Sequence, residues 1–252
     1  MTTLDALTAD EHAALAARLA EIRARVETAP RKTAAAPLLI AVSKTQPAAA
    51  VRAAYALGQR DFGENYVQEL VQKATALAEL DGLRWHVIGH LQRNKVKHVV
   101  EHAQAVHSVD SLGLLAELER RFTGRSVAAG RRAFGDDARL PVLIEVSIAG
   151  EEQKGGCAPG ELGALLEAAE RASALRVVGL MCVPPLGADP AASRPHFERL
   201  AALRDAHGGA ARLPELSMGM TQDFEQALAA GASVVRVGTA IFGTRPPRAG
   251  AQ

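Results

Sequence analysis

The sequence contains little cysteine, with two such residues, Cys157 and Cys182, in a chain of 252. The two lie far apart and match neither the spacing of a zinc site nor that of a redox motif. So few cysteines exclude a disulfide framework and are typical of proteins from a reducing compartment. We therefore expect a cytoplasmic protein.

Charge of one sign and long apolar runs are also missing. Lys and Arg number 29 and Asp and Glu number 28, so a formal net charge of +1 gives no reason to expect nucleic acid or an anionic membrane as a partner. No apolar run approaches the roughly 20 residues that cross a bilayer. Residues 1–30 are amphipathic and carry acids near the start, unlike a signal peptide.

The chain does contain enough apolar material for a sizeable core. Its 48% hydrophobic and 23% charged residues are typical of soluble globular proteins. The length suits either one α/β barrel or two small domains. A helix is predicted from about residue 10 to 28, because Leu15, Leu19, Ile22 and Val26 share one face of it.

After residue 30, short apolar segments alternate with longer helical ones. Eight segments have the composition of strands: 37–44, 60–64, 85–89, 105–110, 141–148, 175–181, 214–219 and 233–243. Seven of them are followed by a predicted helix: 47–57, 66–80, 91–101, 111 onward, 159–172, 193–206 and 221–230.

This alternation implies parallel strands joined by right-handed crossovers, and eight such strands close a barrel. The alternative, a doubly wound open sheet, would carry a glycine-rich turn after its first strand, where this chain has SKTQP. We therefore predict an α/β fold: a single (β/α)8 TIM barrel over about 37–245 with an additional N-terminal helix. The whole chain, 1–252, is then one domain.

Active sites of such barrels lie at the carboxyl ends of the strands, and Lys44 ends the first one. The period of two places Ile40, Val42 and Lys44 on one side of that strand. A lysine in line with core aliphatic residues is partly desolvated, which lowers its pKa and leaves an amine able to attack an aldehyde. The alternative is a surface lysine whose amine reaches water.

The ends of the last two strands have the composition of a phosphate site. Gly219 and Gly238 allow close approach of backbone N–H groups to an anion, and Ser217 and Thr239 offer hydroxyl donors. The loops after strands seven and eight often build such a site in barrels. A Schiff-base lysine, a phosphate cup and an arginine at one barrel mouth are what a pyridoxal 5′-phosphate (PLP) site needs.

The runs AVSKTQP, GQRDFGENYVQEL, WHVIGHLQRNK, GLMCVPP and LSMGMTQDFEQALAAGASVVRVGTAIFG closely resemble the PLP homeostasis protein family. The match covers about residues 38–245. The resemblance implies an alanine-racemase-like barrel without the racemase's second domain, with PLP held as an internal aldimine on Lys44. It also implies a role in keeping free PLP low and in delivering it, with PLP-dependent apo-enzymes as acceptors.

Carried over residue by residue, Lys44 matches the Schiff-base lysine, and Asn65 in FGENY matches an asparagine next to the cofactor. The cofactor-binding residues implied by the resemblance are Lys44, Asn65, Ser217, Met218, Gly219, Arg236, Gly238 and Thr239. Lys154 matches a lysine in the loop after the fifth strand. Arg236 shares one side of its strand with Val234, so we expect it to point inward and to contact the pyridine nitrogen of PLP, with the phosphate as second choice.

Three functional hypotheses follow. The first is a monomeric, non-catalytic PLP carrier, to which no catalytic residue is assigned. The second is a PLP-dependent amino-acid racemase, which needs a second base from another domain, whereas only PPRAGAQ follows the last strand. The third is an aldolase-type barrel that uses Lys44 without PLP.

Two further features are interpreted as incidental. His98 and His102 have the spacing of a helical metal pair, but no third ligand is apparent, so no metal is expected. The arginine-rich stretch 120–139 lacks apolar periodicity and is interpreted as a solvated loop rather than a basic patch for an anion or RNA.

Overall fold

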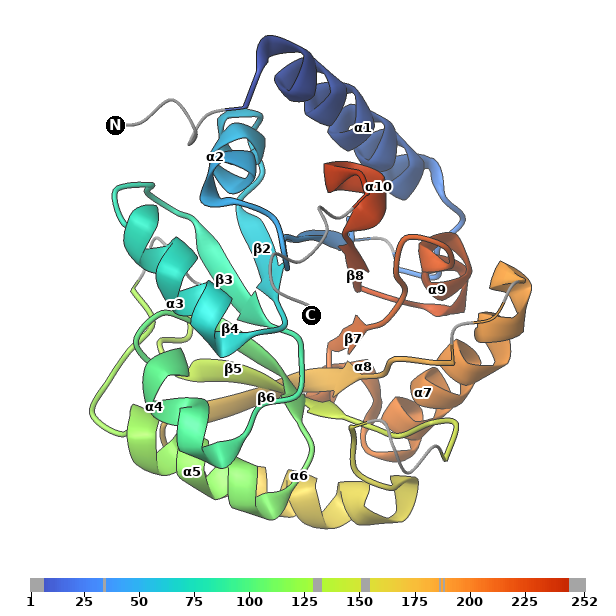
Figure 1. Cartoon of the computed structure of the whole chain (residues 1–252). Helices are drawn as coiled ribbons and strands as arrows, with labels where there is room; N and C mark the ends of the chain where they lie inside the picture. Colours follow the sequence, from blue (N-terminus) through green and yellow to red (C-terminus); the bar gives the residue numbers. More distant parts are fainter. Residues whose placement is uncertain are drawn as a thin grey trace, which may run out of the picture.

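Eight parallel strands form a closed barrel, each strand paired with its neighbours in sequence order and β8 with β1 (Figure 1). The structure is a computed structural model that describes residues 7–33, 35–128, 133–150, 155–185, 187 and 189–244. The strands are β1 (Leu38–Val42), β2 (Asp61–Glu64), β3 (Arg84–Val87), β4 (Ala105–Val109), β5 (Leu140–Glu145), β6 (Leu175–Met181), β7 (Glu215–Ser217) and β8 (Val234–Val237). The predicted fold, a (β/α)8 TIM barrel, is confirmed.

Helices surround the barrel and cover the outer face of the strands. They are α1 (Ala9–Thr28), α2 (Ala48–Ala56), α3 (Val67–Ala76), α4 (Val96–Val99), α5 (Leu112–Phe122), α6 (Leu162–Glu170), α7 (Arg194–Ala206), α8 (Gly209–Arg212), α9 (Phe224–Ala230) and α10 (Thr239–Phe242). None of these described helices combines the length and apolar character needed to cross a bilayer. The predicted strand 233–243 stops at Val237, and α10 follows it.

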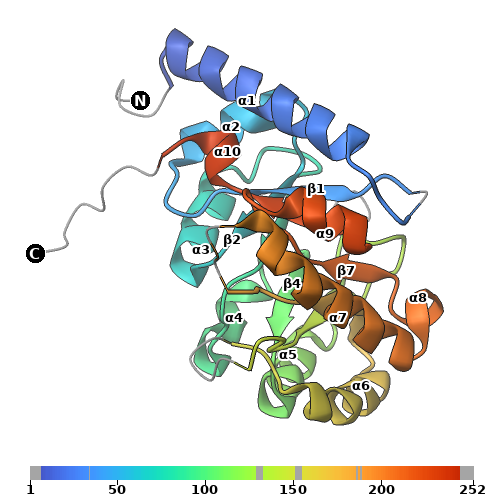
Figure 2. The same ribbon diagram turned by 90° about the vertical axis from the view of Figure 1, so that its right-hand side faces the viewer.

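The N-terminal helix α1 lies outside the barrel and packs against α10 and α2, as Figure 2 shows. A capping box between Thr8 and Glu11 starts it, and its predicted apolar face is buried. Arg18 donates a hydrogen bond of 2.8 Å to the Ile241 carbonyl in α10. The additional helix therefore supports the short helix that follows the last strand.

Side-chain alternation along the strands separates the barrel interior from the layer under the helices. Ile40 of β1 and Val234 of β8 belong to an inner cluster, whereas Ala41 and Val235 belong to the larger outer core. The inward side predicted for β1 and β8 is thus observed. In one respect β1 differs: it ends at Val42, so Lys44 lies in the turn that follows.

Part of the arginine-rich stretch is core rather than solvated loop. Its first residues complete α5, and Phe134 is buried at the base of the barrel in the inner cluster with Ile40 and Leu143. The Phe134 ring also contacts two buried histidine rings, with centroid distances of 5.9 and 6.0 Å. A lone phenylalanine among arginines and glycines has no periodicity, so its burial leaves no pattern in the sequence.

Candidate functional site

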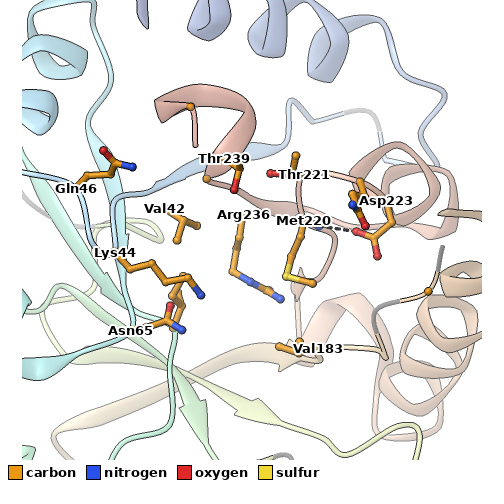
Figure 3. Close-up of a pocket in the computed structure, with 15 residues that line it drawn as sticks. Val42, Lys44, Gln46, Asn65, Val183, Met220, Thr221, Asp223, Arg236 and Thr239 are labelled. Atoms are coloured by element: carbon orange, nitrogen blue, oxygen red, sulfur yellow. Dashed lines mark hydrogen bonds between the residues drawn. The ribbon is translucent and has the colours of Figure 1, made fainter. Parts of the chain in front are cut away.

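A cavity of about 680 Å³ opens where the strands end at their carboxyl side (Figure 3). Segments after β1, β2, β3, β6, β7 and β8 all contribute to its wall. It is lined by Val42, Lys44, Gln46, Asn65, Ile88, Val183, Gly187, Met220, Thr221, Gln222, Asp223, Arg236, Gly238, Thr239 and Gly243. This is the end of the barrel at which the sequence predicted a site.

Five residues predicted from the sequence come together in this cavity: Lys44, Asn65, Arg236, Gly238 and Thr239. Lys44 and Asn65 reach in from one side, and Thr239 lies across the cavity from Asn65, as Figure 3 shows. Arg236 extends from β8 between these two groups. An amine, a guanidinium and the start of a helix therefore face one space.

The backbone on both sides of Lys44 is held by a buried cluster. The Ser43 carbonyl accepts a hydrogen bond of 2.6 Å from the Lys73 amine, and the Thr45 N–H donates one of 2.7 Å to the Glu69 carboxylate. Thr45 has φ 64°, a left-handed conformation that is rare for a branched residue. The cluster thus fixes a strained turn that turns Lys44 away from the strand direction.

The same cluster contains a buried ion pair. The Lys73 amine lies 2.7 Å from the Glu64 carboxylate and 3.0 Å from that of Glu69, and the Ser43 hydroxyl donates to Glu64 at 2.7 Å. Burial raises the pKa of Glu64, and the charge of Lys73 opposes that rise. Lys73 is therefore a structural lysine that is paired with two carboxylates and does not line the cavity.

Replacing Lys73 with methionine is expected to destabilise the protein by about 3 to 5 kcal/mol, because the Glu64 carboxylate is left buried without its cation. Urea unfolding followed by circular dichroism measures this difference. The matched control is Lys97→Met at an exposed position, expected to change stability by no more than about 0.5 kcal/mol. Equal stabilities of the two variants would contradict this description of the cluster.

Arg236 is a buried cation whose observed partners are uncharged. Its guanidinium donates to the Ser217 hydroxyl at 2.5 Å and to the Cys182 carbonyl at 2.9 Å, and 3% of the residue is exposed. Within the described part of the chain it forms no ion pair. A guanidinium carries five donors and no acceptor, so the side that faces the cavity can hold a ligand acceptor.

The groups around Arg236 are tuned by burial. Burial lowers the pKa of Arg236. Burial also raises the pKa of Glu145, at the end of β5, to about 7, and the positive charge of Arg236 opposes this rise. Burial also raises the pKa of Cys182 to about 12. The Cys182 thiol therefore stays protonated at neutral pH.

The wall opposite Asn65 is the start of α10. Gly238 follows β8 and precedes α10, and a Cβ there would lie 3.2 Å from the Val42 carbonyl oxygen, so the glycine permits close contact with β1. Thr239 opens α10, whose first N–H groups have no acceptor within the helix. A helix start with a hydroxyl side chain is suited to an anion.

Three predicted residues lie next to the cavity without lining it. Ser217 is fully buried and binds Arg236, and Met218 is fully buried in the core beneath the helices. Gly219 has φ 89°, and a Cβ there would lie 2.5 Å from that of Ala227, so this glycine lets α9 pack closely. Ser217 thus supports the wall of the cavity through Arg236, and Met218 and Gly219 support it through packing.

The loop after β7 supplies residues that the sequence analysis missed. The helix expected to begin near Thr221 begins at Phe224, because the Asp223 carboxylate accepts the Met220 N–H at 2.7 Å and holds a turn before it. Thr221, Gln222 and Asp223 therefore line the cavity. The run MTQD between a short strand and a helix is the signal that could have located this loop.

The predicted histidine pair does not line this cavity. The helix α4 ends at Val99, so His98 and His102 do not share a helix. Among the described residues, no three His, Cys, Asp or Glu side chains gather as ligands for a metal ion. Lys154 lies outside the described residues.

Comparison with known proteins agrees with this geometry. Residues 17–246 match the family model of the alanine racemase N-terminal domain. The pyridoxal phosphate homeostasis protein of Pseudomonas aeruginosa is 44% identical over 236 residues, covering 92% of this chain and 96% of that protein. The chain belongs to the pyridoxal phosphate homeostasis protein family. The resemblance seen in the sequence is confirmed.

Two solved structures of similar proteins share the barrel fold of this chain. PipY of Synechococcus elongatus, a structure with PLP bound, is 38% identical, with a TM-score of 0.75 and coverage of 91% of this chain and all of that one. Alanine racemase of Streptomyces coelicolor has a TM-score of 0.68 at 23% identity, and the match covers 93% of this chain and 59% of the racemase. The latter shows a shared fold.

Proposed function

We propose that this chain binds PLP in the cavity at the carboxyl end of the barrel and holds it covalently on Lys44. Lys44 would hold the cofactor through its aldehyde, as a Schiff base formed with loss of water. Nothing is oxidised or reduced in this step. The bound cofactor supplies a conjugated ring able to withdraw electrons from an attached amine.

One observation carries the proposal: Lys44, the buried Arg236 and the start of α10 line the same cavity. Each suits a different part of PLP, namely the aldehyde, the ring nitrogen and the phosphate. Arg236 keeps donors facing the cavity although it is almost fully buried, which suits an acceptor ligand. The PLP-bound structure of PipY, 38% identical to this chain, supports the same cofactor here.

The remaining contacts follow from the chemistry of the side chains. The Asn65 carboxamide hydrogen-bonds the 3-hydroxyl group beside the aldehyde, because it lies next to Lys44. The N–H groups at Gly238 and Thr239, with the Thr239 hydroxyl, hold the phosphate. Ser217, Met218 and Gly219 support this pocket from behind: the Ser217 hydroxyl accepts from Arg236, and the other two pack in the core.

Arg236 donates to the pyridine nitrogen and thereby keeps that nitrogen unprotonated. An unprotonated pyridine withdraws electrons poorly, so carbanion chemistry on bound PLP is slow. This property favours a carrier over the alternative, an amino-acid racemase. An aldolase-type use of Lys44 without PLP would give no reason for a phosphate site at Gly238 and Thr239, unless the substrate itself were phosphorylated.

We further propose that the protein acts in PLP homeostasis within the cytoplasm. It keeps free PLP low and delivers the cofactor to PLP-dependent apo-enzymes. The name of its Pseudomonas aeruginosa relative supports this role. In this proposal the chain works as a monomer in which residues 1–252 form one PLP-binding domain.

The experiment is an absorption spectrum of the purified protein after incubation with PLP and desalting. A visible band of the Schiff base, in a ratio approaching one PLP per chain, is expected. A spectrum without such a band would contradict the proposal. Turnover of added alanine at about 1 per second or faster would support the racemase instead.

A further inference from the structure

A continuous chain of hydrogen bonds crosses the barrel interior behind the cavity. It runs from Arg236 on β8 to the Ser217 hydroxyl on β7 at 2.5 Å, and from there to Nδ1 of His107 on β4 at 2.9 Å. Nε2 of His107 lies 3.0 Å from Nδ1 of His86 on β3, and Nε2 of His86 lies 2.9 Å from the Asp61 carboxylate on β2. All five residues are buried.

The two ends of this chain fix its direction. The Arg236 guanidinium can only donate. At the other end, Arg84 holds Asp61 with two hydrogen bonds of 2.6 and 2.5 Å. Burial raises the pKa of Asp61, but the bonds from Arg84 and His86 outweigh it, and the net shift is downward. Asp61 is therefore a carboxylate that only accepts.

With both ends fixed, neutral histidines have a single consistent arrangement. The Ser217 hydroxyl accepts from Arg236 and donates to Nδ1 of His107. His107 then carries its proton on Nε2 and donates to Nδ1 of His86, which donates through its own Nε2–H to Asp61. Burial lowers the pKa of His107 well below its ordinary value, which agrees with a neutral ring.

We propose that His107 and His86 are positioning residues that hold the Ser217 hydroxyl as the acceptor for Arg236 and so aim the guanidinium at the cavity. Every link donates toward Asp61, so each acceptor is made more basic by the next bond in the chain. This inference rests on the proposed function only in naming PLP as the ligand that Arg236 contacts.

A purely structural role for the histidines makes different predictions. Both rings pack against Phe134, which belongs to the inner cluster of the barrel. If packing were their role, an aromatic ring of similar size at position 107 would replace His107. If the hydrogen bonds matter, phenylalanine would fail, and asparagine, which keeps an acceptor near Ser217, would restore part of the effect.

The first test uses PLP binding measured by fluorescence quenching in titrations with the cofactor. His107→Phe and Ser217→Ala are each expected to weaken binding by about tenfold or more, as removal of a supporting partner does in comparable sites. The double variant is expected to be no weaker than Ser217→Ala alone, because His107 acts through that hydroxyl. His107→Asn is expected to bind more tightly than His107→Phe.

Phe134→Leu is the matched control, since it alters packing on both histidine rings but no hydrogen bond of the chain. It is expected to lower the thermal midpoint without weakening PLP binding. The inference would be overturned if His107→Phe bound PLP with wild-type affinity. It would also be overturned if the fold-losses of the two single variants multiplied in the double variant. Absence of PLP binding by the wild-type protein would instead refute the proposed function.

The second test needs no cofactor. Nitrogen-15 shifts of the histidine rings in the PLP-free protein report which ring nitrogen carries the proton. The expected result is that His86 and His107 are both neutral and both protonated at Nε2. A charged ring, or a proton on Nδ1 of either, would break the direction of the chain and overturn the inference even if the substituted proteins failed to fold.

Discussion

Replacing Lys44 with alanine is expected to abolish the visible absorption band of the PLP-loaded protein while leaving weak, reversible PLP binding. The covalent bond is lost, but the contacts of Arg236 on β8 and of Gly238–Thr239 after it remain. We expect the dissociation constant to rise by at least about tenfold, equivalent to 1.4 kcal/mol. Difference absorption and fluorescence titration measure the two effects separately.

Lys97→Ala is the matched control for this prediction, because Lys97 is exposed and outside the cavity. It should keep both the band and the affinity of the wild-type protein. A Lys44→Ala protein that retains the band would show that another lysine forms the bond. A Lys44→Ala protein that loses all measurable PLP binding would show that the non-covalent contacts alone do not bind the cofactor.

Replacing Arg236 with methionine is expected to weaken PLP binding by about 10- to 150-fold, because hydrogen bonds from a charged donor contribute about 1.5 to 3 kcal/mol. Methionine has a similar length and no donor. The Lys44 bond still forms in this variant at high PLP concentration, so the band persists. A titration with PLP, followed by the absorption band, measures both quantities: the midpoint gives the affinity, and the final height of the band shows whether the Lys44 bond forms.

Arg236→Lys is the comparison variant for this position. It keeps a positive charge but loses the planar fork that reaches the Ser217 hydroxyl, the Cys182 carbonyl and the ligand at once. Its affinity should lie between those of the wild-type and methionine proteins. Equal affinity of wild type and Arg236→Met would contradict a contact between this guanidinium and PLP.

Local patterns in the sequence predicted the barrel and part of the site. Alternation along β8 placed Arg236 on the inward side, and the strand count gave a closed sheet, because each of these signals lies within a few residues. Lys44 lines the cavity as expected, but from the turn after β1 rather than from the strand itself. The buried face of α1 was likewise predicted from the helical spacing of its apolar residues. These features depend on short-range geometry alone.

Other parts of the site depend on partners far apart in the sequence. Lys73 on an amphipathic helix reads as an exposed residue, yet it is buried against Glu64 from the preceding strand. Ser217 was predicted from the sequence to donate to a phosphate, but its hydroxyl is hydrogen-bonded to Arg236 and to His107, which lies 110 residues away in the sequence. No periodicity encodes such pairings, so the supporting contacts around the cavity appear only in three dimensions.

The central claim is that Lys44 holds PLP covalently, and borohydride trapping tests it most directly. The PLP-loaded protein is reduced with borohydride, digested and mapped by peptide mass spectrometry. We expect one phosphopyridoxyl group per chain, on the peptide that contains Lys44. A label found wholly on another lysine, or no label at all, would contradict the account.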